Sequence, residues 1–212
     1  YMLREATRPW PLWCTDSVYA DLTRGNPILQ VLSHYCGIDR RRIDLQGDGF
    51  SVDGVTGVRW RGLPVAGKPA PYSPNRESPV PGDNVALLIM GQDGDGGGGK
   101  TALYAPGLGA VEEHVWKAMQ AADCVLLDGT FWADDEMIRL GLSAKRARDI
   151  GHLPQSGAGG LLEWLERLPA ATRKILIHIN NTNPILDERS PERAELRGRG
   201  IEVAWDGMEI LL

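Results

Sequence analysis

The sequence contains few of the residues that mark several common classes of protein. Its 212 residues include only three cysteines, Cys14, Cys36 and Cys124, and they lie far apart. An odd number of widely spaced cysteines argues against a disulfide framework and against a cysteine-rich zinc site within this chain. We therefore expect a reducing, cytoplasmic environment.

Long hydrophobic runs and clusters of basic residues are also missing. The longest apolar runs, residues 85–90 and 124–127, are too short to cross a membrane, and the opening residues do not have the pattern of a signal peptide. The formal net charge is −5 and the basic residues are scattered, so no electrostatic footprint for nucleic acid is present. We expect neither a membrane nor a nucleic acid as a partner.

The composition that remains is that of a compact globular protein. Hydrophobic residues make up 42% of the chain, which is enough for one core, and we predict a single domain over residues 1–212. Segments with strand and helix patterns alternate, which predicts an α/β fold.

In the first half of the chain we predict a strand over residues 11–14 and a helix near Ser17 that Asp16 caps. A second helix begins at Asn26-Pro27 and ends at Cys36-Gly37. Residues 38–84 are predicted to be mostly β-structure with turns, and residues 58–63 alternate as a half-buried strand does. The proline-rich residues 66–83 exclude a regular helix or a central strand, and long loops of this kind are often functional.

The second half begins with a predicted hairpin of residues 85–90 and 102–105. Residues 92–99 between them have the aspartate spacing of a calcium loop, but the downstream glutamate is missing, so we interpret them as a flexible turn. His114 lies beside the apolar face of a helix over residues 110–122 and is interpreted as a surface or packing residue. The other expected helices are 134–140, 144–150, 161–168 and one from Ser190-Pro191 to near Gly198; the other expected strands are 125–127, 174–179, 201–205 and 208–212.

Three predicted strand or helix ends deliver a polar side chain into a loop: Asp128, His152 and His178. Ligand sites of α/β folds lie at such ends. His178 is either a metal ligand or a histidine satisfied by a hydrogen bond in the core. Asp128 either binds a metal or accepts a hydrogen bond at the site, or it caps a turn at Gly129. His152 is either a proton donor or a helix-end residue favoured by the helix dipole.

The residues alone leave these alternatives open. The chain has no His-x-His-x-Asp-His motif and no His-Glu-x-x-His motif, so the site that it predicts is incomplete.

Residues 177–187, Ile-His-Ile-Asn-Asn-Thr-Asn-Pro-Ile-Leu-Asp, resemble the signature of the PqqB family, which acts in the biosynthesis of pyrroloquinoline quinone (PQQ). The further matching segments are residues 13–16, 71–74, 81–84, 104–109, 128–130, 134–137, 151–153, 190–195 and 206–208. The resemblance covers essentially the whole chain. It implies the αββα sandwich of the metallo-β-lactamase fold.

The family also has an N-terminal segment with a cysteine cluster typical of structural zinc and a metal motif that ends in Asp-His. The resemblance implies that this chain lacks those N-terminal strands and that motif, so that Tyr1 is an internal residue. We therefore expect the chain alone to be inactive and poorly stable.

The resemblance implies a metal site made by the family's Asp-His pair together with His178. Iron(II) is the expected metal, with zinc possible in preparations. The implied reaction is iron-dependent hydroxylation of the tyrosine in a Glu-Tyr precursor of PQQ. Pro106-Gly107 stand where hydrolytic relatives have a bridging aspartate, which disfavours a dinuclear hydrolase.

By position, the resemblance suggests His152 and Asp128 for proton transfer. Asn180, Asn181, Asn183, Ser73 and Arg76 are the expected contacts to a small peptide-derived precursor, and a homodimer is possible. The alternative is a carrier that transports PQQ or its precursor to the periplasm, in which Arg76, Lys68 and the asparagines near His178 would bind the polyanion.

Overall fold

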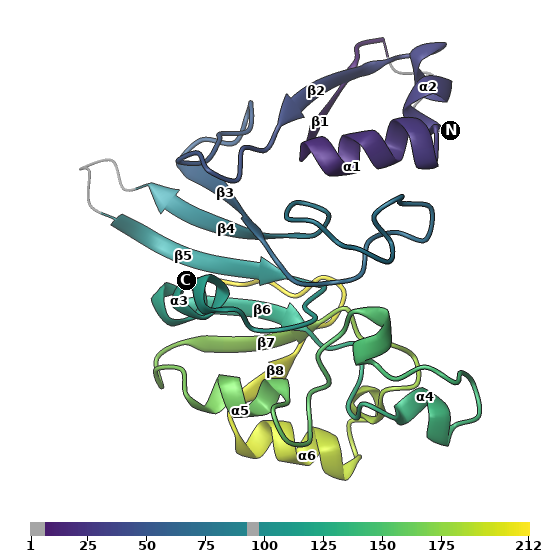
Figure 1. Cartoon of the computed structure of the whole chain (residues 1–212). Coiled ribbons are helices and arrows are strands. Elements are labelled where there is room, and N and C mark those ends of the chain that lie inside the picture. Colours follow the sequence, from purple (N-terminus) through teal and green to yellow (C-terminus); the bar gives the residue numbers. More distant parts are fainter. Residues whose placement is uncertain (1–6, 93–97) are drawn as a thin grey trace.

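The computed structural model describes residues 7–92 and 98–212, and a six-stranded mixed sheet forms its centre (Figure 1). The strands lie in the order β3 (Val58–Pro64), β4 (Val85–Gln92), β5 (Gly98–Ala105), β6 (Cys124–Asp128), β7 (Arg173–Ile177) and β8 (Ile201–Val203). The first three strands pair antiparallel, and β5 to β8 run parallel to one another. The predicted hairpin is confirmed as β4 and β5; most of the turn predicted between them, residues 93–97, lies outside the described residues.

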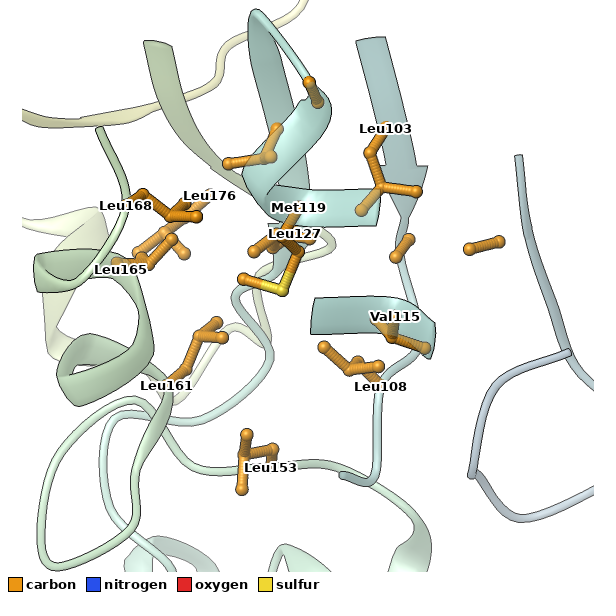
Figure 2. Packing of buried hydrophobic residues seen from close by; sticks show 14 of the residues in the cluster. Leu103, Leu108, Val115, Met119, Leu127, Leu153, Leu161, Leu165, Leu168 and Leu176 are labelled. Carbon is orange, nitrogen blue, oxygen red and sulfur yellow. The ribbon is translucent and has the colours of Figure 1, made fainter. Parts of the chain in front are cut away.

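Helices α3 (Glu113–Ala121), α5 (Leu161–Glu166) and α6 (Pro191–Gly198) lie between successive parallel strands in the chain and cover one face of the sheet. Figure 2 shows the core that they form with Leu103, Leu127 and Leu176 from three neighbouring strands. The helices lie on one face because parallel strands are joined by crossovers of constant hand. Within the described part of the chain, no helix has both the length and the apolar character needed to cross a bilayer.

The opposite face of the sheet carries a smaller apolar cluster. It contains Ala102, Cys124 and Ile175, with Met208 and Ile210 packed against it. The predicted strand over residues 208–212 is therefore wrong: these residues contact the sheet through side chains and form no strand.

A separate two-stranded parallel sheet precedes the central one. It consists of β1 (Trp10–Cys14) and β2 (Ile38–Arg42), joined through α1 (Asp16–Ala20), η2 (Asp21–Gly25) and α2 (Ile28–Ser33). The cap predicted for α1 needs correction. The hydroxyl of Thr15 accepts the hydrogen bond from the Val18 amide at 3.2 Å, while Asp16 lies in the first turn and pairs with Arg40 and Arg42.

The loop over residues 65–84 is irregular, as its prolines predict, and side-chain hydrogen bonds attach it to the N-terminal segment. The Thr15 hydroxyl donates to the Gly82 carbonyl at 2.6 Å, and the buried Ser73 hydroxyl donates to Asp21 at 2.9 Å. The loop therefore has a defined position between the two sheets.

Two predicted helices are shorter than expected. Only α4 (Glu136–Arg139) forms within residues 134–140, and only the 3-10 turn η3 (Arg148–Ile150) forms within residues 144–150. Asp134 accepts the Arg148 amide at 3.2 Å, and Asp149 accepts the Arg146 amide at 2.8 Å. The bond to Asp134 takes the Arg148 amide, which a continuous helix would pair with the Ala144 carbonyl.

Candidate metal centre

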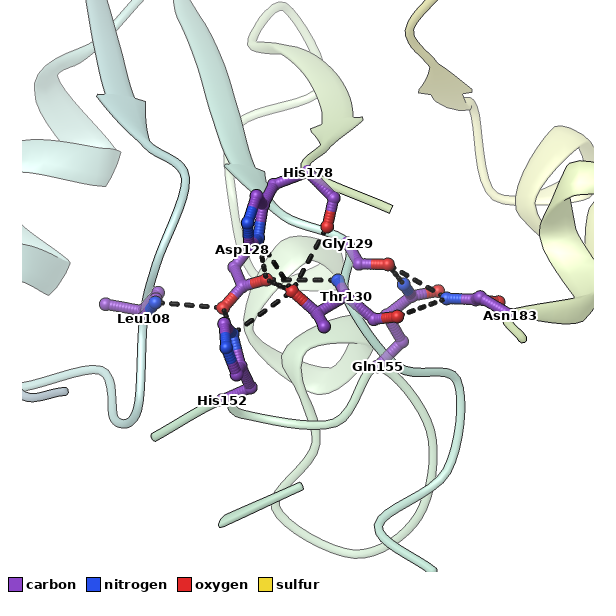
Figure 3. Close-up of polar contacts among 8 residues, drawn as sticks. All are labelled: Leu108, Asp128, Gly129, Thr130, His152, Gln155, His178 and Asn183. Carbon is purple, nitrogen blue, oxygen red and sulfur yellow. Dashed lines mark hydrogen bonds and ion pairs between the residues drawn. The ribbon is translucent and has the colours of Figure 1, made fainter. Parts of the chain in front are cut away.

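Asp128, His152 and His178 meet at the edge of the sheet where the parallel strands end (Figure 3). Asp128 is the last residue of β6, His178 follows β7 directly, and His152 follows η3 after Gly151. One ligand atom of each residue lies within 4.8 Å of those of the other two. We call these three residues the polar cluster.

Asp128 is completely buried, and both of its carboxylate oxygens are occupied. Oδ2 accepts the Leu108 amide at 2.9 Å and lies 2.6 Å from Nδ1 of His152. Oδ1 accepts the amide and the hydroxyl of Thr130 at 3.0 and 2.5 Å. Burial by itself raises the pKa of Asp128, but the hydrogen bond with His152 and the nearby His178 imidazole outweigh it and lower that pKa to about 2. Asp128 is therefore ionised at neutral pH.

His178 has a strained backbone. Its φ of 54° is the only positive value among the described residues other than glycine, and it stops β7 at Ile177, two residues before the predicted end of the strand. The Asn180 amide donates to the Thr130 carbonyl at 3.1 Å and the Gly129 amide to the Ile177 carbonyl at 2.7 Å, so both sides of His178 are fixed. Strain of this kind persists where the surroundings determine the conformation, and it is concentrated at functional sites.

The two imidazole rings lie close together on the accessible side of the polar cluster. Their centroids are 5.5 Å apart with an angle of 23° between the planes, and 19% of the His152 side chain and 55% of the His178 side chain are exposed. The nearby Asp128 carboxylate raises the pKa of His178, and burial acts in the opposite direction.

Two amide side chains hold the turn that follows Asp128. Gln155 and Asn183 both donate to the Gly129 carbonyl, at 2.7 and 2.8 Å. Both are buried, and Asn183 also accepts the Ile185 amide at 3.1 Å. Sequence reasoning missed Gln155, because no local pattern connects it with Gly129, and it did not single out Thr130, which the Asp-Gly-Thr segment already contained.

The other predicted substrate contacts are dispersed. Asn181 is exposed, whereas the amide of Asn180 donates to Thr182 at 2.6 Å. Asn183 is occupied by the bonds just described, Ser73 by Asp21, and Arg76 by the Pro69 carbonyl. Among the described residues, no hydrogen bond joins Ser73 or Arg76 to the polar cluster, and their role in substrate binding stays a prediction.

Thr182 in turn donates to Oε1 of Glu136 at 2.5 Å, and the Trp132 amide donates to Oε2 of this buried glutamate at 2.8 Å. Glu136 therefore ties the segment after Asp128 to the segment after His178.

The donor set fits a metal ion. Imidazole nitrogens and carboxylate oxygens are ligands for zinc and for non-haem iron. No described residue hydrogen-bonds to Nε2 of His152 or His178, whereas every oxygen of Asp128 is engaged inside the protein. The imidazoles are therefore the groups available to a metal, and Asp128 is placed as the buried carboxylate that orients them.

An open hollow of about 450 Å³ lies beside His178. Its lining includes Tyr104, Ile177 and Trp205 and is therefore largely apolar. A flat apolar group bound there would contact His178.

Known proteins resemble this chain along its whole length. A family model described as the beta-lactamase superfamily domain matches residues 1–179. Coenzyme PQQ synthesis protein B of Azoarcus sp. (strain BH72) is 61% identical over 211 residues, which cover 100% of this chain and 68% of that protein. The protein of the same name from Methylobacillus flagellatus is 53% identical over 212 residues, with the same coverage.

Solved structures show the same likeness. The crystal structure of Zn²⁺-bound PqqB from Methylobacterium extorquens matches with a TM-score of 0.82 and 30% identity, over 100% of this chain and 67% of that one. A diphosphatase from the PhnP family matches with a TM-score of 0.54 and 13% identity over 95% of this chain and 58% of that one, a likeness of fold alone. The predicted metallo-β-lactamase-type α/β fold is confirmed.

Proposed function

Because the chain belongs to the beta-lactamase superfamily and, within it, to the family of coenzyme PQQ synthesis protein B, we propose that it acts in PQQ synthesis as an iron-dependent oxygenase. The proposed substrate is a small peptide-derived precursor, Glu-Tyr, whose tyrosine ring is hydroxylated. The observation that carries the proposal is the convergence of two accessible imidazoles on one buried, ionised carboxylate.

In this proposal His178 is a metal ligand and His152 transfers a proton, while Asp128 holds the latter ring in place. The support is geometric: Nδ1 of His152 lies 2.6 Å from Asp128, and its Nε2 has no hydrogen-bond partner among the described residues. A bound iron(II) ion would supply the redox chemistry of the reaction, which zinc cannot supply. The relative from Methylobacterium extorquens is zinc-bound, so the identity of the metal has to be part of the test.

The hollow beside His178 supports an aromatic substrate. Tyr104 and Trp205 contribute aromatic rings to its lining, and rings of this kind pack well against a tyrosine side chain. The exposed amide of Asn181 is a candidate contact for the polar ends of the dipeptide.

The test compares two proteins: this chain, and a form extended to the full length of the Azoarcus relative with that relative's remaining residues. Each is loaded with iron(II) or zinc(II) without oxygen, given Glu-Tyr and ascorbate, and exposed to air. One oxygen atom of O₂ should enter a ring C–H bond as a hydroxyl group. The other should leave as water, with two electrons from ascorbate and two protons. Mass spectrometry measures the added oxygen.

We expect the extended form to give product with iron and none with zinc, and this chain alone to give none. In the extended form, His178→Ala should abolish product formation and His152→Ala should reduce it strongly. His114→Ala is the matched control, because His114 is exposed and contacts the Pro64 carbonyl outside the polar cluster. If neither form adds oxygen with iron and both bind PQQ, the oxygenase proposal fails and the carrier of PQQ or its precursor replaces it.

A further inference from the structure

The hydroxyl of Thr130 lies at the centre of the polar cluster (Figure 3). Its Oγ1 is 2.5 Å from Oδ1 of Asp128, 2.9 Å from Nδ1 of His178 and 3.1 Å from Nδ1 of His152. The His178 carbonyl is also 3.1 Å away, and the residue is buried. One hydroxyl thus contacts every member of the cluster, although it has only one proton to donate.

The short contact to Asp128 determines where that proton lies. Each carboxylate oxygen of Asp128 accepts a backbone amide, from Leu108 or from Thr130, so Asp128 acts as an acceptor and the distance of 2.5 Å to Oδ1 requires the proton of the Thr130 hydroxyl between the two oxygens. If Thr130 donated instead to the His178 carbonyl, its oxygen would face the carboxylate with no hydrogen between them. Thr130 therefore donates to Asp128, gives no proton to the His178 carbonyl, and can accept only from an imidazole N–H.

The two histidines differ in how they reach the carboxylate. Nδ1 of His152 lies 2.6 Å from Oδ2 of Asp128, a direct hydrogen bond. Nδ1 of His178 lies 3.7 Å from the nearest Asp128 oxygen, which is too long for one, and its close partner is the Thr130 oxygen. Since that oxygen accepts, the His178 ring has to carry its proton on Nδ1.

We propose that Thr130 is a positioning residue that connects the Asp128 carboxylate to His178 and fixes its imidazole as the Nδ1–H tautomer. The chain of donors runs from His178 Nδ1–H to Thr130, and from the Thr130 hydroxyl to Asp128. Nε2 of His178 then keeps its lone pair, the form of the ring that binds a metal ion. The relevance to metal binding rests on the proposed function, whereas the tautomer itself does not.

A purely structural role for Thr130 predicts something different. Its amide donates to Oδ1 of Asp128, a bond that closes the turn at Gly129 and needs no hydroxyl. Thr130→Val keeps this amide and nearly the same volume, whereas Thr130→Ser keeps both the amide and the hydroxyl. Comparing these two variants therefore distinguishes the effect of the turn from the effect of the hydroxyl contact.

The test is nitrogen NMR of the chain labelled with ¹⁵N in its histidine side chains, at a pH well above the raised pKa of His178. The His178→Ala spectrum identifies the His178 signals. In the wild type and in Thr130→Ser, we expect a protonated, pyrrole-type Nδ1 and a bare, pyridine-type Nε2. In Thr130→Val, His178 should shift towards the Nε2–H form, while His152 stays Nδ1–H through its direct bond to Asp128 and serves as internal control.

A wild-type His178 that is protonated on Nε2 overturns the inference without any variant. A Thr130→Val protein in which His178 remains Nδ1–H also overturns it, because the tautomer of His178 is then fixed without the Thr130 hydroxyl. A circular dichroism melt shows whether Thr130→Val is folded, and Thr130→Ala, which also lacks the hydroxyl, replaces it if it is not.

The second readout is the zinc affinity of the form extended to the full length of the Azoarcus relative, because the resemblance places the family's Asp-His pair in the added residues. It is measured by competition with a chromogenic chelator. We expect Thr130→Val to weaken Zn²⁺ binding about 10- to 100-fold and Thr130→Ser to restore it, as for other groups that orient a metal-binding histidine. Unchanged Zn²⁺ affinity in Thr130→Val contradicts the link to metal binding. If the NMR result holds but the extended form with wild-type His178 binds no more Zn²⁺ or iron than its His178→Ala variant, the contact through Thr130 stands and the metal-binding role of His178 in the proposed function fails.

Discussion

The two sheets of the molecule are stabilised by different forces. The six-stranded sheet has a continuous apolar core in which Leu103, Leu127 and Leu176 are completely buried. The two-stranded sheet has few buried apolar neighbours, and much of its contact with the rest of the chain is polar: Asp16 pairs with arginines of β2, and Asp21 accepts the Ser73 hydroxyl.

The comparison shows why the polar cluster belongs to the six-stranded sheet. An ionised carboxylate can be buried only where fixed donors surround it, and the segments that follow β5, β6 and η3 supply four such contacts to Asp128. The same rigidity maintains the strained backbone of His178. In the N-terminal region the ion pairs of Asp16 lie on the surface, where such pairs stabilise little.

We expect the largest loss of stability when the buried carboxylate of Asp128 is removed. Asp128→Ala leaves the amides of Leu108 and Thr130 and Nδ1 of His152 without their acceptor, so we expect a loss of about 3–5 kcal/mol in the free energy of unfolding. Asp21→Ala is the counterpart in the N-terminal region, because Asp21 is also buried but accepts one side-chain hydrogen bond, from Ser73. We expect about 1–2 kcal/mol there. Urea unfolding measures both, and equal losses would contradict the contrast between the two regions.

The pH dependence of the Asp128 effect has a definite sign. Its pKa is lowered from 3.8 to about 2 in the folded protein, so its contribution is fully present above pH 3.8 and is lost as pH falls through 2. The shift corresponds to about 2 kcal/mol. Between neutral pH and pH 4 the difference in stability between the wild type and Asp128→Ala should widen, because Asp128 raises the pKa of His178 and stabilises its protonated form; below pH 4 the difference should narrow.

The contrast between the apolar core of the six-stranded sheet and the polar contacts elsewhere also explains which features could be predicted from the sequence. Strands β4 to β7 were recognised because burial on both faces is visible in local apolar runs. Asp128 and His178 were recognised because parallel strands end at one edge of a sheet, which brings their last residues together. The resemblance to the PqqB family supplied the family and the type of sandwich, which local patterns could not.

What was missed depends on contacts between distant residues. The expected helix over residues 144–150 is interrupted where the side chain of Asp134 accepts the Arg148 amide, and nothing local signals that bond. The amide contacts to Gly129 join Gln155 and Asn183 across 26 and 54 residues of chain. The left-handed backbone of His178 is likewise set by its surroundings, because histidine has no strong preference for it.

Two glycines, one in each region, should give stability losses of intermediate size when they are replaced by alanine. Gly151, directly before His152, has a φ of 90°, and an added Cβ would lie 2.4 Å from the Lys68 amide nitrogen. Gly37, before β2, has a φ of 74° and open space around it. We expect Gly37→Ala to cost about 1 kcal/mol for its backbone alone and Gly151→Ala to cost about 3 kcal/mol, since a clash with backbone adds to the strain.

Gly151→Ala should also reduce turnover of the iron-loaded, full-length form, because the displaced backbone carries His152 away from Asp128. Gly37→Ala should leave turnover unchanged. Thermal unfolding and the oxygen-addition assay measure the two effects, and a Gly151→Ala protein as stable and active as Gly37→Ala would show that the loops at the site are more adaptable than the core beneath them.

The smallest effect is expected at the surface charges of the N-terminal region. Hydrogen bonds from Arg42 and Arg40 lower the pKa of the exposed Asp16, so the pairs stabilise the fold above the usual aspartate pKa and stop doing so as pH falls below it. Asp16→Asn should reduce stability slightly at low ionic strength and not at all in about 1 M salt, where the screening length is about 3 Å. The loss in Asp128→Ala should be the same at both salt concentrations, because the carboxylate and its donors are buried. Urea unfolding of the two variants at low and high salt therefore distinguishes the two regions by the salt dependence of their stability. A loss of stability in Asp16→Asn that does not change with salt would mean that Asp16 acts through the start of α1 and not through its arginine partners.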